Sequence, residues 1–176
     1  VKVLGNMLGL SPETITDLRY AAGLHDFYKK GEKEIVQARG LSWESFEEAG
    51  TESERIIREA DFSDNVVRLA GSVGHTSLKE TEKVLGRYPH SESDIAFLAM
   101  HYVDDYTVGS DWVPQRDGGR NALDKRMDKN ETNERYRVLD EEGRDHFAGE
   151  PTFKAQRRIG YLVEKTLAGL ISERTG

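Results

Sequence analysis

The residues best suited to chemistry in this sequence are His25 and Asp26, near the end of a helix expected over residues 11–30. A neutral imidazole nitrogen and a carboxylate oxygen are suitable ligands for a divalent ion. An apolar stripe of this helix continues into His25, Asp26 and Lys29 without changing face, because the positions are spaced by three and four. An unpaired buried carboxylate is costly, which favours a partner or a metal. A helix end that faces solvent is the alternative interpretation of the same residues.

The segment AAGLHDFYK, residues 21–29, resembles the signature of the HD-domain metal-dependent phosphohydrolase superfamily. The matching positions are two small residues, an apolar residue, the His-Asp pair and a following lysine: Ala21, Ala22, Leu24, His25, Asp26 and Lys29. The resemblance implies that His25 and Asp26 hold a metal together with an early histidine and a distant aspartate. In HYVDDYT, residues 101–107, Asp104 takes the place of the distant ligand, and Asp105 is the alternative.

The early histidine of the superfamily has no counterpart in residues 1–10, which read VKVLGNMLGL. The numbering begins at Val1 rather than at a methionine, so we expect upstream residues to exist. Either the histidine lies among them or the site lacks this ligand.

Three further residues are candidates for contact with a phosphate. We expect Lys29 to hold a phosphate oxygen or a neighbouring carboxylate in catalysis, although a surface lysine at a helix end fits equally well. His75 follows Gly74 at a helix end, where many HD proteins have a phosphate or second-metal contact; a histidine favoured by the helix dipole is the alternative. Arg116 lies in a glycine-rich loop and suits bidentate binding of a substrate phosphate, although a surface arginine is the alternative.

The resemblance implies a metal-dependent phosphohydrolase that acts on a nucleotide or a similar small phosphate ester. The expected cofactor is a divalent ion (Mn, Mg, Fe, Co, Ni or Zn), which would activate a water molecule and neutralise phosphoryl oxygens. The alternative function is a degenerate, non-catalytic HD domain that binds a ligand or a partner, and the missing early histidine motivates it.

The elements that must position these residues are all expected to be helices. Ser11 is a favourable N-cap, and Pro12 suits the first helical position. Further helices are expected after Ser42, Ser63, Ser77 and either Ser91 or Ser93, with breaks at Gly31 and near Gly50, and a last amphipathic helix is expected to be capped by Thr152. No strand alternation is present. We therefore predict an all-α, single irregular helical bundle of the HD type over 1–176, with a core of about 1–110 on which the helices of 122–176 pack.

The overall composition limits the classes of partner. The net charge of −7 argues against non-specific binding to nucleic acid or membranes. The chain has no cysteine, which excludes thiolate metal sites and fits a reducing cytoplasm. No apolar run approaches the length of a membrane span. The sequence leaves the oligomeric state open, a homo-oligomer included.

Overall fold

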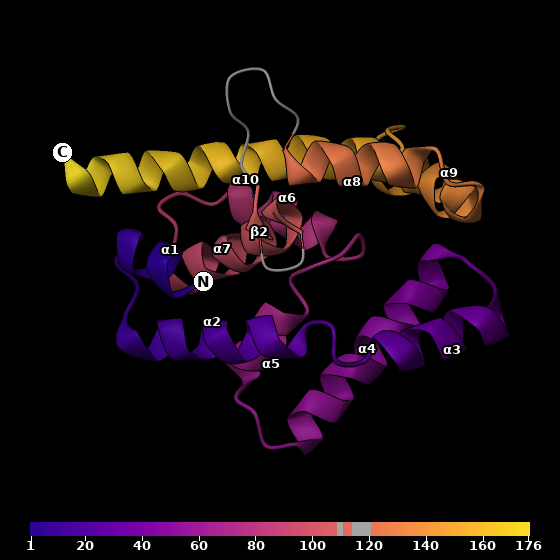
Figure 1. Ribbon diagram of the computed structural model, residues 1–176, viewed down its shortest axis with the longest axis horizontal. Helices are drawn as coiled ribbons and strands as arrows, with labels where there is room; N and C mark the ends of the chain where they lie inside the picture. Colours follow the sequence, from indigo (N-terminus) through magenta and orange to yellow (C-terminus); the bar gives the residue numbers. More distant parts are fainter. Residues whose placement is uncertain (109–110, 114–120) are drawn as a thin grey trace.

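The computed structural model describes residues 1–108, 111–113 and 121–176, and it is an all-α helical bundle, as predicted (Figure 1). The elements in chain order are α1 (Lys2–Met7), α2 (Pro12–Leu24), α3 (Lys29–Arg39), α4 (Trp43–Glu59), α5 (Asp64–Ala70), α6 (Leu78–Leu85), α7 (Glu92–Tyr106), β1 (Thr107–Val108), β2 (Asp111–Trp112), α8 (Ala122–Glu131), the 3₁₀ helix η1 (Glu134–Tyr136), α9 (Arg137–His146) and α10 (Thr152–Thr175). In this part of the chain, no helix is long and apolar enough to cross a membrane.

Helix α7 lies at the centre of the fold. It packs against α2 on one side and α10 on the other, and α1, α5, α6 and α8 also contact it (Figure 1). Most of its residues are buried, because the segment from Ile95 to Met100 is apolar on every face. A helix with no polar face belongs in the interior.

Serine N-caps start several helices as the sequence predicts. The Ser11 hydroxyl accepts a hydrogen bond from the Thr14 N–H, and Pro12 occupies the first helical position. Equivalent side-chain caps begin α4, α5 and α7 at Ser42, Ser63 and Ser91. The prediction for Thr152 was wrong: Pro151 is the N-cap of α10, and the Thr152 hydroxyl donates instead to the Leu139 carbonyl.

The helix predicted over 11–30 is two helices, because α2 ends at Leu24 and α3 begins at Lys29. The residues between them form a turn, in which Phe27 N–H donates to the Leu24 carbonyl. The predicted break at Gly31 was wrong, and α3 continues through it. A Cβ at Gly31 would lie 2.2 Å from the ring of Tyr28, so the bare glycine backbone provides the space for this ring.

Helices α3 and α4 pack together as a pair at one side of the molecule (Figure 1). The interruption predicted near Gly50 is absent, because α4 continues unbroken from Trp43 to Glu59. The Trp43 N–H at its start donates to Glu142 of α9, and α4 also contacts α5. The pair therefore forms one wall beside the end of α2.

The C-terminal helices cover the opposite side of α7. Helix α10 runs the length of the molecule and contacts α6, α7, α8 and α9 (Figure 1). Its buried stripe includes Phe153, Ile159, Val163 and Leu167. Only two short strands, β1 and β2, interrupt the helical pattern in the described part, and they pair antiparallel directly after α7.

Candidate metal centre

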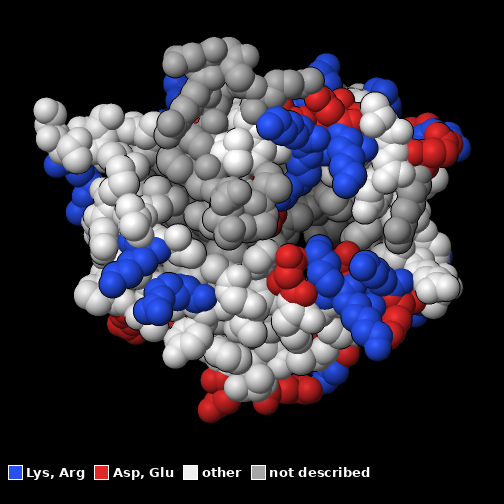
Figure 2. All heavy atoms as spheres, in the orientation of Figure 1, with Lys and Arg blue, Asp and Glu red and all other residues white. Residues whose placement is uncertain are grey.

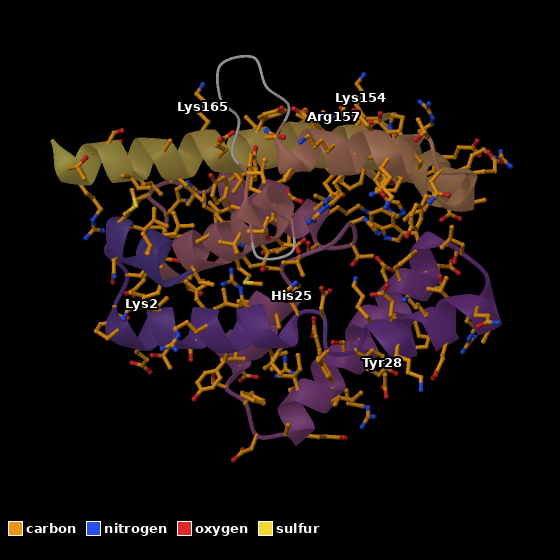
Figure 3. All side chains as sticks on the ribbon, in the orientation of Figure 1. Lys2, His25, Tyr28, Lys154, Arg157 and Lys165 are labelled. Carbon is orange, nitrogen blue, oxygen red and sulfur yellow. The ribbon has the colours of Figure 1, made fainter. Side chains whose placement is uncertain are left out.

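His25 lies immediately after α2 and faces α7 (Figure 3). Its Nδ1 lies 2.9 Å from the carbonyl oxygen of Ala22. A carbonyl can only accept, so Nδ1 carries the proton and donates. In the neutral ring this leaves the lone pair of Nε2 free, which is the state that a metal ligand requires.

Two carboxylates approach Nε2 of His25. It lies 3.4 Å from Oδ2 of Asp26 and 3.5 Å from Oδ1 of Asp104. The other oxygen of each carboxylate faces a cation: Lys29 Nζ is 3.5 Å from Asp26 Oδ1, and Arg126 Nη1 is 3.1 Å from Asp104 Oδ2. The structure thus brings together the three predicted metal ligands, with one oxygen of each acid directed at the imidazole.

The electrostatics of this cluster follow from these contacts. Burial would raise the pKa of Asp104, but His25 and Arg126 outweigh it and hold the pKa at about 2. The hydrogen bond with Asp104 in turn raises the pKa of His25, against the lowering effect of burial. Partial burial would lower the pKa of Lys29, but Glu32 and Asp26 together raise it. Without a metal, the cluster is therefore a network of ion pairs.

Arg126 is a functional candidate that the sequence did not indicate. Its guanidinium binds the Asp104 carboxylate and also donates to the Asp104 and Thr107 carbonyls at 2.8 and 3.1 Å. The same guanidinium therefore caps carbonyls at the C-terminal end of α7 and fixes the orientation of the Asp104 carboxylate. In the sequence it is one of many charges in the polar segment of residues 122–148, and only the packing of α8 on α7 distinguishes it.

Asp105, the alternative ligand in the sequence, pairs with a different histidine. Its side chain is 1% exposed, and its Oδ1 lies 4.0 Å from Arg126 Nη1, the nitrogen that binds Asp104. Gln156 Nε2 donates to its Oδ1 at 3.0 Å, and His101 Nε2 lies 3.3 Å from its Oδ2. His101 is itself fixed through Nδ1, which donates to the Ser72 carbonyl at 2.9 Å.

His75 lies at the base of the same cleft as His25. Phe46 and Phe153 meet its ring edge-on, with centroids 5.2 and 5.7 Å away. Burial lowers the pKa of His75 to about 4, so the ring is neutral near pH 7. The expected phosphate or second-metal contact of His75 stays a prediction. Arg116 lies outside the described residues.

A cleft of about 1170 Å³ contains these groups, and His25, Asp26, Lys29, His75, Asp104 and Arg126 line it. Figure 2 shows a recess with lysine and arginine side chains gathered over α8 on one side and over α3 on the other. Each described basic side chain of the lining already has an acidic partner: Lys29 with Asp26, Arg58 with Asp64, Arg68 with Asp94, and Arg126 with Asp104. Acids outnumber bases in the lining, which adds Glu32, Glu47, Glu54 and Glu80.

The donor chemistry of the cluster fits a divalent ion, since it offers one free imidazole nitrogen and two carboxylate oxygens. The distances between these side chains fit an ion less well than their chemistry does. Within the described residues, no group of three or more His, Asp or Glu side chains is arranged to hold a metal. The contacts of 3.4 and 3.5 Å to Nε2 are those of an ion-pair cluster. An ion would have to replace these pairings.

No protein-family model, curated protein or solved structure matches this chain. A functional proposal therefore depends on the site itself and on the HD-like segment of residues 21–29.

Proposed function

We propose that the protein is a metal-dependent phosphohydrolase of the HD type, acting on a phosphate ester of a nucleotide or a similar small molecule. The observation that carries the proposal is the convergence of His25, Asp26 and Asp104 in a cleft large enough for such a substrate. These residues come from two helix ends that are distant in the sequence, and the HD resemblance predicts all three.

In this proposal His25 provides Nε2, and Asp26 and Asp104 provide the oxygens that now face it. A bound divalent ion supplies a water of lowered pKa and neutralises phosphoryl oxygens. Lys29 and Arg126 keep the outer oxygens of the two carboxylates occupied, which fixes the direction of the inner ones. Mn, Mg, Fe, Co, Ni and Zn are the candidate ions, because imidazole and carboxylate ligands suit several of them.

The pairing of the basic side chains makes phosphate binding depend on the ion. None of the described cations of the lining is free of an acidic partner, so a phosphate ester meets a surplus of negative charge in the metal-free cleft. A divalent ion reverses this local charge. We therefore expect nucleotides to bind far more tightly to the metal-loaded protein than to the protein stripped with a chelator.

Metal analysis combined with an activity assay tests the proposal. Purified protein is expected to bind one of Mn²⁺, Mg²⁺, Co²⁺ or Ni²⁺ and to release phosphate from members of a nucleotide panel. Asp26→Ala should weaken metal binding by about 100-fold or more, since loss of a supporting contact alone costs about 10–100-fold. Asp145→Ala on α9 changes an exposed carboxylate and is the matched control. If the protein takes up no metal and releases no phosphate with any of these ions, the assignment is contradicted.

A non-catalytic HD-like binding domain is the second candidate. The observation that favours it is that each acid of the cluster already has a cationic partner and no three-residue metal group is present among the described residues. In that case Asp26→Ala changes only an exposed ion pair, and stability should fall by no more than about 1 kcal/mol. Calorimetry with nucleotides in the presence of a chelator distinguishes the two, because only this candidate expects binding without a metal.

A further inference from the structure

Gln156 of α10 lines the cleft together with His75 and binds the buried Asp105. Its side chain is 3% exposed. The amide nitrogen donates to the Asp105 carboxylate at 3.0 Å, and a carboxylate accepts only, so this contact fixes which end of the amide faces Asp105. The carbonyl oxygen Oε1 must then point away from Asp105.

Oε1 of Gln156 and Nδ1 of His75 are both buried and have no hydrogen-bond partner, so the structure does not pair them with each other. Oδ2 of Asp105, on the carboxylate that the amide binds, also has no hydrogen-bond partner. An unsatisfied buried polar atom costs about 1–3 kcal/mol, so the pair would gain by meeting. The two atoms are complementary, because Oε1 accepts and Nδ1 donates in one of the two neutral tautomers of the ring.

The effect of Gln156 on His75 has the sign expected of a carbonyl acceptor. Burial lowers the pKa of His75 to about 4, and the side chain of Gln156 opposes part of this fall. A hydrogen-bond acceptor raises an imidazole pKa, because it favours the protonated form. Phe153, which precedes Gln156 by one turn of α10, packs against the ring of His75 with centroids 5.7 Å apart, and this contact places Gln156 beside the ring.

We propose that Gln156 is a positioning residue whose carbonyl oxygen holds Nδ1–H of His75, so that the ring presents an unprotonated Nε2 to the cleft. His75 lines the cleft while its Nδ1 is buried, so the ring reaches the cleft by the edge that bears Nε2. The flanking rings of Phe46 and Phe153 restrict its rotation.

This tautomer determines what His75 can recognise. An unprotonated nitrogen accepts a hydrogen bond and cannot donate one to an ionised phosphate oxygen. The inference rests on the proposed function and narrows its substrate class to a phosphate ester that also carries a hydroxyl, as a sugar phosphate or nucleotide does. His75 binds the hydroxyl, and the phosphate lies toward His25 and the two carboxylates.

The tautomer can be measured directly by ¹H–¹⁵N correlation spectra of the imidazole rings in the ¹⁵N-labelled full chain near pH 7, without metal or substrate. His75→Asn assigns the resonances. We expect Nδ1 of His75 to be protonated and Nε2 to have the shift of a bare nitrogen. A spectrum of the wild-type protein with His75 in the Nε2–H form, or as an imidazolium, would overturn the proposal.

A variant then tests the role of Gln156 itself. Gln156→Met keeps the length of the side chain and removes the acceptor, so His75 should lose the Nδ1–H form and shift toward Nε2–H, which an unconstrained histidine prefers. His146, which stacks on Trp43 with centroids 4.1 Å apart, is the internal control and should not change. An unchanged His75 in a folded Gln156→Met protein would exclude Gln156 as the positioning residue. An inactive protein with the expected tautomer would count against the phosphohydrolase assignment alone.

Discussion

Two histidine–aspartate pairs lie at the C-terminal half of α7 and are built from the same contacts. His25 donates through Nδ1 to the Ala22 carbonyl and faces Asp104 through Nε2. His101 donates through Nδ1 to the Ser72 carbonyl and faces Asp105 through Nε2. The His25 and Asp104 side chains are each 21% exposed, whereas those of His101 and Asp105 are each 1% exposed.

The difference follows from the helix geometry. Successive residues of an α-helix point about 100° apart, so Asp104 and Asp105 leave α7 in different directions. Asp104 reaches the cleft and Asp105 reaches the interior under α10. The pair of His25 and Asp104 is therefore accessible to solvent and can exchange partners. The pair of His101 and Asp105 is enclosed and cannot.

The largest expected effect of this contrast is on stability. Asp105→Ala leaves the buried His101 without its counter-charge and Gln156 without its acceptor, and the free energy of unfolding should fall by about 3–5 kcal/mol. Asp104→Ala should cost less, about 2 kcal/mol, because His25 and Arg126 are 21% and 34% exposed and keep contact with water. Urea denaturation of both variants measures the difference. Equal losses would show that the two pairs are energetically alike.

The dependence of stability on pH sharpens the same comparison. Burial alone would lower the pKa of His101, but Asp105 outweighs it and raises the pKa above 6.5. A raised pKa in the folded state contributes stability that is fully present below about 6.5 and is lost as the pH rises through the folded value. We therefore expect wild-type stability to fall above neutral pH.

His101→Gln should reduce this slope, and whatever slope remains belongs to other groups such as His25, whose pKa is also raised. Denaturant midpoints collected across neutral and alkaline pH provide the measurement. Parallel curves for wild type and variant would contradict the assignment of the charge to His101.

The smallest expected effect concerns Arg126. Arg126→Gln removes the bonds to the Asp104 carboxylate and to two carbonyls at the end of α7, and should destabilise the fold by about 1 kcal/mol. Arg137 makes similar contacts with Glu134 and Glu141 on an exposed surface, so Arg137→Gln should change stability by less than about 0.5 kcal/mol. Thermal denaturation of the two variants side by side checks the order.

Helix starts could be predicted from the sequence more reliably than helix ends. Ser11, Ser42, Ser63 and Ser91 act locally, since each caps its own first turn. The end of α2 at Leu24 and the continuation of α3 through Gly31 were not predicted. A glycine inside a helix weakens it by about 1 kcal/mol without ending it, so Gly31 alone could not mark a boundary.

The candidate site shows the same division. The segment of residues 21–29 indicated His25 and Asp26, and the pattern around residue 104 left two adjacent acids open. Both faces of α7 are apolar, so periodicity could not choose between Asp104 and Asp105. Arg126 and Gln156 were missed because their roles depend on how α8 and α10 pack against α7.

The neutralised cations of the cleft also affect which solutes it admits. A simple anion such as sulfate or orthophosphate would have to compete with a tethered carboxylate for each described lysine or arginine of the lining. In the proposed enzyme, a bound divalent ion would offset the negative charge of the lining, and the cation would then bind before the ester.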